Sequence, residues 1–159
     1  MEFNWAHVHL WLNHFPVFGI LFGLVLLIVA LRSKNDPLKR LSLILFVCIG
    51  LITIGTYLTG EPAEEVAEHI PGVSESAIEP HEESALWSLI AIEALAVVSL
   101  AGLLFSRRSV IPSTFITICL LFSIIAMALV TWTAYLGGQI HHPETRPGFQ
   151  APVAGNRSE

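Results

Sequence analysis

Four long apolar stretches, separated by short polar segments, dominate the sequence. They cover about residues 10–31, 41–58, 85–105 and 111–136. A helix rises about 1.5 Å per residue, so roughly 20 residues cross the hydrocarbon core of a bilayer, and each stretch is long enough, the second with its flanks. None of them alternates apolar and polar residues, which excludes membrane β-strands. The pattern predicts an all-α integral membrane four-helix bundle.

The polar segments complete the predicted organisation. Residues 1–146 form one four-helix domain, and residues 147–159 form a polar tail rich in Pro and Gly. The connection 60–84, between the second and third helices, is acidic. A short interfacial helix is predicted over about residues 62–69 and ends at the Pro-Gly pair that follows it.

Basic residues predict the orientation in the membrane. Most of them lie in the connections between the first and second and between the third and fourth stretches: Arg32, Lys34, Lys39, Arg40, Arg107 and Arg108. Short basic connections stay in the cytoplasm. We therefore expect a multi-pass protein of the bacterial inner (cytoplasmic) membrane, with both termini and the 60–84 connection on the periplasmic side. An aromatic belt is expected at that outer level: Trp5, Trp11, Trp87, Trp132 and Tyr135.

Composition narrows the function classes. The chain is 53% apolar and 13% charged, against about 25% charged residues in soluble domains. A net charge of −5 without a basic run argues against a nucleic-acid partner and leaves membrane lipid as the first partner. The sequence has no phosphate loop, no zinc-protease helix and no Cys-x-x-Cys-His motif for covalent haem. An electron carrier or a complex subunit is therefore favoured over a stand-alone enzyme.

The histidines are the main candidates for chemistry. All seven fall on the predicted outer side, which is weak evidence by itself, but five lie within about two turns of a membrane boundary and come from three helices: His9, His14, His81, His141 and His142. Imidazoles at one level of a small bundle suit a metal or haem iron. On a continuous helix His7 and His14 lie about 20° apart and His9 and His14 about 140° apart, so one iron would not bind both of the latter. This argument weakens if the helix begins at Pro16.

Glutamates offer further candidates. Glu93 is the one ionisable side chain deep in an apolar stretch, which makes it a functional hypothesis by default. It is predicted either to handle protons or to stay neutral and structural, with hydrogen bonds to hydroxyl groups on neighbouring helices. Glu82 and Glu144 lie beside histidines, and oxygen ligands suit Zn or Fe more than haem. Solvated loop charge is the alternative for both.

Small residues and a short internal echo suggest how the helices pair. Gly19 and Gly23 form a Gly-x-x-x-Gly pattern, which indicates close helix packing or room for a flat macrocycle. The second and fourth stretches end in similar segments, Thr56-Tyr-Leu-Thr-Gly60 and Thr133-Ala-Tyr-Leu-Gly137. The first and third stretches each begin just after a histidine. Two duplicated hairpins explain this pattern, and so does coincidence.

Two motifs carry a family resemblance. His9-Leu-Trp-Leu-Asn-His14-Phe-Pro and Gly137-Gly-Gln-Ile-His-His142-Pro-Glu144 resemble the opening and closing motifs of a bacterial family of four-helix membrane proteins catalogued as a domain of unknown function. The resemblance marks these residues as candidates: His9, His14, His81 and His142. It also implies association with respiratory or electron-transfer proteins. The chain departs from the family pattern at His141 and in its glutamate-rich connection.

These observations predict a b-type cytochrome-like protein. Non-covalent haem b, one or two per chain, would be held near the periplasmic face by His14 with His81, and a second haem by His9 with His142. A periplasmic cytochrome, a quinone or a larger respiratory complex would be its partner. One alternative is a cofactor-free membrane anchor or accessory subunit. Another is a Zn, Cu or Fe site of His and Glu, with these additional ligands: His7, His141, Glu82 and Glu144.

Overall fold

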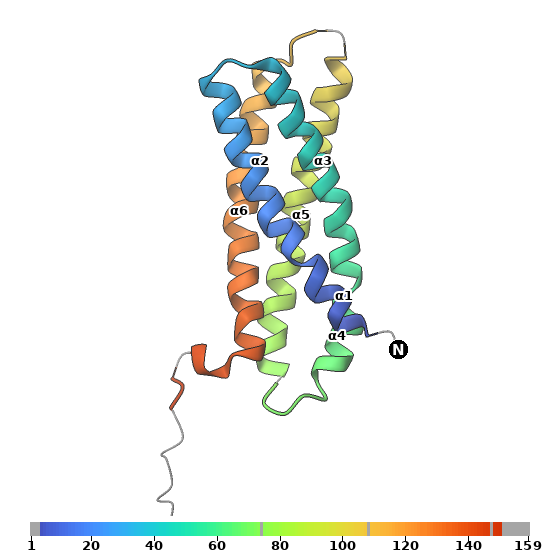
Figure 1. Cartoon of the computed structure of the whole chain (residues 1–159), viewed down its shortest axis with the longest axis vertical. Helices are drawn as coiled ribbons and strands as arrows, with labels where there is room; N and C mark the ends of the chain where they lie inside the picture. Colours follow the sequence, from blue (N-terminus) through green and yellow to red (C-terminus); the bar gives the residue numbers. More distant parts are fainter. Residues whose placement is uncertain (1–3, 74, 108, 147, 151–159) are drawn as a thin grey trace, which may run out of the picture.

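The computed structural model describes residues 4–73, 75–107, 109–146 and 148–150. Within these residues the chain is helical, without strands, and forms a four-helix bundle (Figure 1). The helices are α1 (Trp5–Leu12), α2 (His14–Arg32), α3 (Asp36–Leu58), α4 (Gly60–Ala67), α5 (Glu75–Phe105) and α6 (Ser113–His141), followed by the short 3-10 helix η1 (Pro143–Thr145). The predicted all-α fold is confirmed. Arg108, Arg157 and most of the predicted tail lie outside the described residues.

Four helical segments are long and apolar enough to cross a membrane. They are Trp5–Arg32, Asp36–Ala67, Glu75–Phe105 and Ser113–His141. The first joins α1 to α2 and the second joins α3 to α4, with breaks at Asn13 and Thr59. The short helix predicted over 62–69 is α4, but much of the remaining acidic connection is helical too, because α5 begins at Glu75.

Each helix packs against two neighbours. α5 lies between α3 and α6, α2 also contacts α3 and α6, and α1 lies across α4 at one end of the bundle (Figure 1). The centre is apolar, with these side chains fully buried: Ile20, Leu27, Leu43, Phe46, Ile92, Leu95 and Cys119. Many large apolar side chains remain on the outer surface, as expected where the surrounding solvent is lipid.

Glycines allow close helix contacts. Gly19 and Gly23 of α2 face Ile49 and Phe46 of α3, so the predicted Gly-x-x-x-Gly pattern is a packing surface that receives larger side chains. A Cβ at Gly50 of α3 would lie 2.7 Å from the Ala96 Cβ of α5. Helix α3 therefore approaches α2 closely at Gly19 and Gly23, and approaches α5 closely at Gly50.

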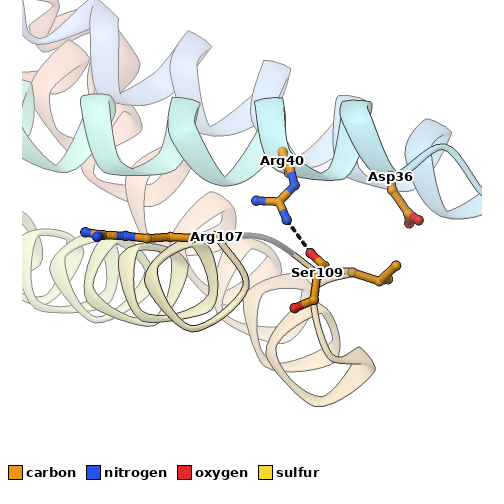
Figure 2. Close-up of a pocket in the computed structure, with 5 residues that line it drawn as sticks. Asp36, Arg40, Arg107 and Ser109 are labelled. Carbon is orange, nitrogen blue, oxygen red and sulfur yellow. Dashed lines mark hydrogen bonds between the residues drawn. The ribbon is translucent and has the colours of Figure 1, made fainter.

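The basic end of the bundle carries a structural clamp. We call this end, where α2 joins α3 and α5 joins α6, the arginine end. Arg40 of α3 donates hydrogen bonds to the carbonyl oxygens of Ser106 and Ser109 in the connection between α5 and α6. Figure 2 shows the bond to Ser109. A cleft of about 550 Å³ lies beside it, and Arg107 extends along the cleft away from Arg40. One guanidinium thus joins α3 to a connection that is far from it in sequence.

Candidate functional site

His9 reaches from α1 to the end of α3. Its Nδ1 lies 3.2 Å from the carbonyl oxygen of Thr56 and 3.1 Å from the hydroxyl oxygen of Thr59. The Thr59 hydroxyl donates to the same carbonyl at 2.7 Å, so its hydrogen is already used. The Thr56 carbonyl also accepts the Thr59 backbone N–H at 3.2 Å, and a carbonyl has no hydrogen to donate to an imidazole. The His9 Nδ1 therefore carries the hydrogen.

His81 makes the equivalent contact in the second half of the bundle. Its Nδ1 lies 3.0 Å from the carbonyl oxygen of Thr133 on α6. This approach needs the glycine four residues further on, since a Cβ at Gly137 would lie 3.0 Å from the His81 Cε1 and 3.1 Å from its Nδ1. A carbonyl cannot donate, so the His81 Nδ1 is the protonated nitrogen as well.

The two contacts give structural content to the internal echo. In each half, a histidine bonds the carbonyl of a threonine that precedes a glycine by four residues: Thr56 and Gly60, then Thr133 and Gly137. Gly60 also lies beside its histidine, since a Cβ there would be 3.8 Å from the His9 Cε1. Two hairpins of related sequence thus place their histidines in matching environments.

The two rings form a pair at one end of the bundle, which we call the histidine end. They lie close enough for a positive charge on His81 to be felt at His9. With Nδ1 protonated, each Nε2 keeps its lone pair, and neither Nε2 has a hydrogen bond within the described residues. The arrangement presents two neutral imidazole lone pairs from separate spans.

The other predicted histidine ligands lie elsewhere. His14 is exposed; its Nδ1 lies 2.7 Å from the Leu10 carbonyl of the preceding turn, and its ring stacks on Phe18 at 6.4 Å. The break at Asn13 interrupts the helix on which the angular comparison of His7 and His14 depended. No contact among the described residues joins His14 to His81, so that pairing stays a prediction without structural support.

The end of α6 carries a separate, exposed pair. The His142 Nδ1 lies 2.8 Å from the Glu144 carboxylate. The backbone N–H of Glu144 and the His142 ring lower the pKa of the Glu144 carboxyl from its usual value. His7 and His141 are exposed, and no contact among the described residues links His142 to His9. Among these residues, no group of three or more His, Cys, Asp or Glu side chains converges as a metal site.

A hydroxyl cluster lies one turn below His81. Ser84 and Ser88 both contact the Thr133 hydroxyl, at 2.7 and 2.8 Å, and that hydroxyl donates to the Leu129 carbonyl at 3.0 Å. Its single hydrogen is therefore used, so both serines donate to it. Sequence reasoning missed this cluster, although the spacing of His81, Ser84 and Ser88 places all three on one helix face.

Two carboxyl groups also meet at the histidine end. Glu64 of α4 and Glu82 of α5 lie within hydrogen-bonding reach of each other. Glu82 follows His81 directly, so the pair borders the histidine site. The sequence prediction that Glu82 acts as a metal ligand stays a prediction, because the contact that the structure gives Glu82 is to another carboxyl group.

Glu93 occupies the interface between α3 and α5. A Cβ at Gly50 would lie 3.4 and 3.5 Å from its two carboxylate oxygens, and its Oε1 is buried without a hydrogen-bond partner among the described residues. The predicted bond to a neighbouring hydroxyl is not formed: Thr53 donates to the Ile49 carbonyl, and Ser99 contacts the Cys119 sulfur. A charged carboxylate here would be unpaired, which favours the neutral acid.

Comparison with protein families gives one match. A family model described as a predicted membrane protein (DUF2231) matches residues 6–143. This range includes the opening motif and all of the closing motif except Glu144. Comparison with curated proteins and with solved structures gave no match.

Proposed function

Because the chain belongs to this family of predicted membrane proteins, we propose that it is a haem-binding electron-transfer protein in which His9 and His81 would hold the haem. One observation carries the proposal: two imidazoles from separate spans lie at the same end of the bundle, near enough to interact electrostatically. Each has its Nδ1 at a backbone carbonyl, and neither Nε2 has a hydrogen bond among the described residues. A ligating histidine commonly donates its other ring hydrogen in this way, which fixes the tautomer and the ring orientation.

The donor set fits a haem better than a tetrahedral metal ion. Haem iron needs two protein ligands, and bis-histidine ligation is the low-spin arrangement that suits electron transfer. A structural zinc site needs three or four protein ligands. The pair supplies two imidazoles, and among the described residues no third His, Cys, Asp or Glu converges with them.

The chain's own residues would set the properties of this site. The Thr56 and Thr133 carbonyls accept the Nδ1 hydrogens and so increase the basicity of each ligand. The absence of a side chain at Gly137 lets the His81 ring pack against α6, which would hold the ring in place. The apolar bundle below provides a low-dielectric surrounding that tunes a bound group's redox potential.

Membrane position and partners follow from the charge pattern. The described basic residues of the two short connections lie at the arginine end, opposite the histidine pair. We infer that the arginine end is cytoplasmic and the histidine end periplasmic. A one-electron carrier of the periplasm, a membrane quinone or a larger respiratory complex would then exchange electrons with the site.

Spectroscopy tests the proposal. The purified protein should give a b-type reduced-minus-oxidised spectrum, and H9A and H81A should each lower the haem content at least tenfold because each removes one of two ligands. H14A and H142A are the matched controls, since both rings are exposed at the same end, and they should keep full haem content.

Three results would contradict the assignment. Loss of haem in H14A with retention in H9A would support the ligand pair predicted from sequence. Zinc or copper in elemental analysis, without a Soret band, would support a metal site. A protein that lacks both signals and co-purifies with a larger complex would support the anchoring role.

A further inference from the structure

A second cleft opens between α5 and α6 at the histidine end. It has a volume of about 310 Å³, and its apolar wall consists of Trp87, Trp132, Leu129 and Leu136. Both tryptophans are 55% exposed on the surface of the spans, so a ligand can enter from the lipid phase. Ligand sites are commonly clefts of about 300 to 1,000 Å³ with apolar and aromatic walls and a few polar groups.

The oxygen atoms in the wall select a hydrogen-bond donor. Glu83 contributes a carboxylate, which accepts hydrogen bonds when ionised. Ser84 also lines the cleft, and its hydrogen is committed to the Thr133 hydroxyl, because the Thr133 hydrogen goes to the Leu129 carbonyl. Ser84 therefore offers only lone pairs to a ligand. A flat ring with hydroxyl donors matches this combination of aromatic wall and acceptor oxygens.

The cleft borders the histidine pair. Pro80 and Ser84 line it, and they lie one residue before and three residues after His81 on α5. Thr133 accepts two hydrogen bonds from this part of α5. Its hydroxyl accepts from Ser84, and its carbonyl accepts from His81. A molecule in the cleft would therefore lie beside the turn of α5 that carries His81.

We propose that this cleft binds the head group of a lipid-soluble quinol, with the ring against Trp87 and Trp132 and its hydroxyl groups donating to Glu83 and Ser84. The choice of a quinol over an aminophospholipid rests on the proposed function, because a redox centre held by His81 makes proximity to a quinol useful.

Direct binding tests the site. The probe is a tritiated short-chain benzoquinol, added without oxygen to the full chain in phosphatidylcholine nanodiscs. Saturable binding is expected. E83Q should weaken it about tenfold, since a charge-assisted hydrogen bond is lost, and the double variant W87L/W132L should abolish it. W11L is the matched control, because Trp11 is an exposed tryptophan of the same end outside the cleft, and it should bind as the unaltered protein does.

Competition separates the outcomes even where a variant fails to fold. Unlabelled quinol should displace the probe from the unaltered protein, and phosphatidylethanolamine should not; displacement by that lipid, or unchanged binding in E83Q and in W87L/W132L, would overturn the proposal. H81A separates this inference from the haem assignment. Quinol binding that persists in H81A without haem supports the cleft, and its persistence in an unaltered protein that holds no haem would contradict only the proposed function.

Discussion

At the scale of the residue, the glycine opposite a histidine decides what the imidazole can reach. His81 bonds a backbone carbonyl inside a long helix, where a side chain at position 137 would block the approach. The neighbouring Gly138 has no atom within 4 Å of its virtual Cβ. Two adjacent glycines of one motif therefore have different roles, and substitution can separate them.

Gly137→Ala should disturb the site. The added methyl group would lie 3.0 Å from the His81 ring, so the ring or α6 must move, at a cost of about 1 to 3 kcal/mol as for other overpacked positions. We expect a lower thermal midpoint in detergent and a reduced haem content. Gly138→Ala should change neither, and equal effects of the two substitutions would refute this role of Gly137.

Glu93→Gln should be tolerated. The side chain lies in an apolar interface with its Oε1 buried and unpaired, so a neutral amide of the same size replaces a neutral acid. The thermal midpoint of the purified protein should stay within the error of the measurement, whereas Glu93→Lys should lower it, because that change places an unpaired charge beside Gly50. A clear loss of proton-coupled activity in Glu93→Gln would instead identify the carboxyl as a proton carrier.

At the scale of the element, side-chain hydrogen bonds to the backbone stabilise the arginine end of the bundle. The Asn35 side chain caps α3 by accepting from the Leu38 N–H at 3.0 Å, and Arg40 ties the first turns of the same helix to the connection that follows α5. The Arg40 bonds help to define the position of α3 along the bundle axis relative to α5 and α6. Apolar side chains alone define this position less well.

Arg40→Gln should destabilise the bundle. The substitution removes hydrogen bonds from a charged donor to two carbonyl groups, each worth about 1.5 to 3 kcal/mol where the donor is charged. Because Arg40 is only partly buried, the low end of that range is expected for the total. Thermal unfolding in detergent measures the effect, and Arg32→Gln is the control, since that side chain is exposed at the same end.

The elements also show how far the sequence alone can go. The four spans were predictable because apolar length is a local property of the chain. The pairing of His9 with His81 was not, because it depends on how α1 lies across α4. His14 was a candidate because it lies near a membrane boundary and in the opening motif, yet its ring lies on the outer surface after the break at Asn13.

At the scale of the whole molecule, charge is separated along the bundle axis. Arg32, Arg40 and Arg107 lie at one end, and the acidic helix α4 lies at the other with the histidine pair. The separation supports one orientation of the whole chain. In the proposed orientation, the candidate redox site lies on the side away from the cytoplasm.

Cysteine labelling in intact cells should reveal this orientation. With Cys48 and Cys119 replaced by Ala, a membrane-impermeant maleimide should label Gly72→Cys, in the connection after α4, and leave Ser33→Cys unlabelled until the cells are lysed. Gly72 has a φ of +91°, so some local strain is expected in that variant. Labelling of Ser33→Cys alone in intact cells would reverse the topology.

The two histidines of the pair are carried by unequal supports. His81 belongs to the 31-residue α5, which packs along α3 and α6, whereas His9 belongs to the eight-residue α1, which has no buried residue. Such a short helix is marginal by itself and depends on its neighbours for order. Cyanide or imidazole would therefore displace His9 from a bound haem before it displaces His81. His81 would then keep the haem bound to the protein.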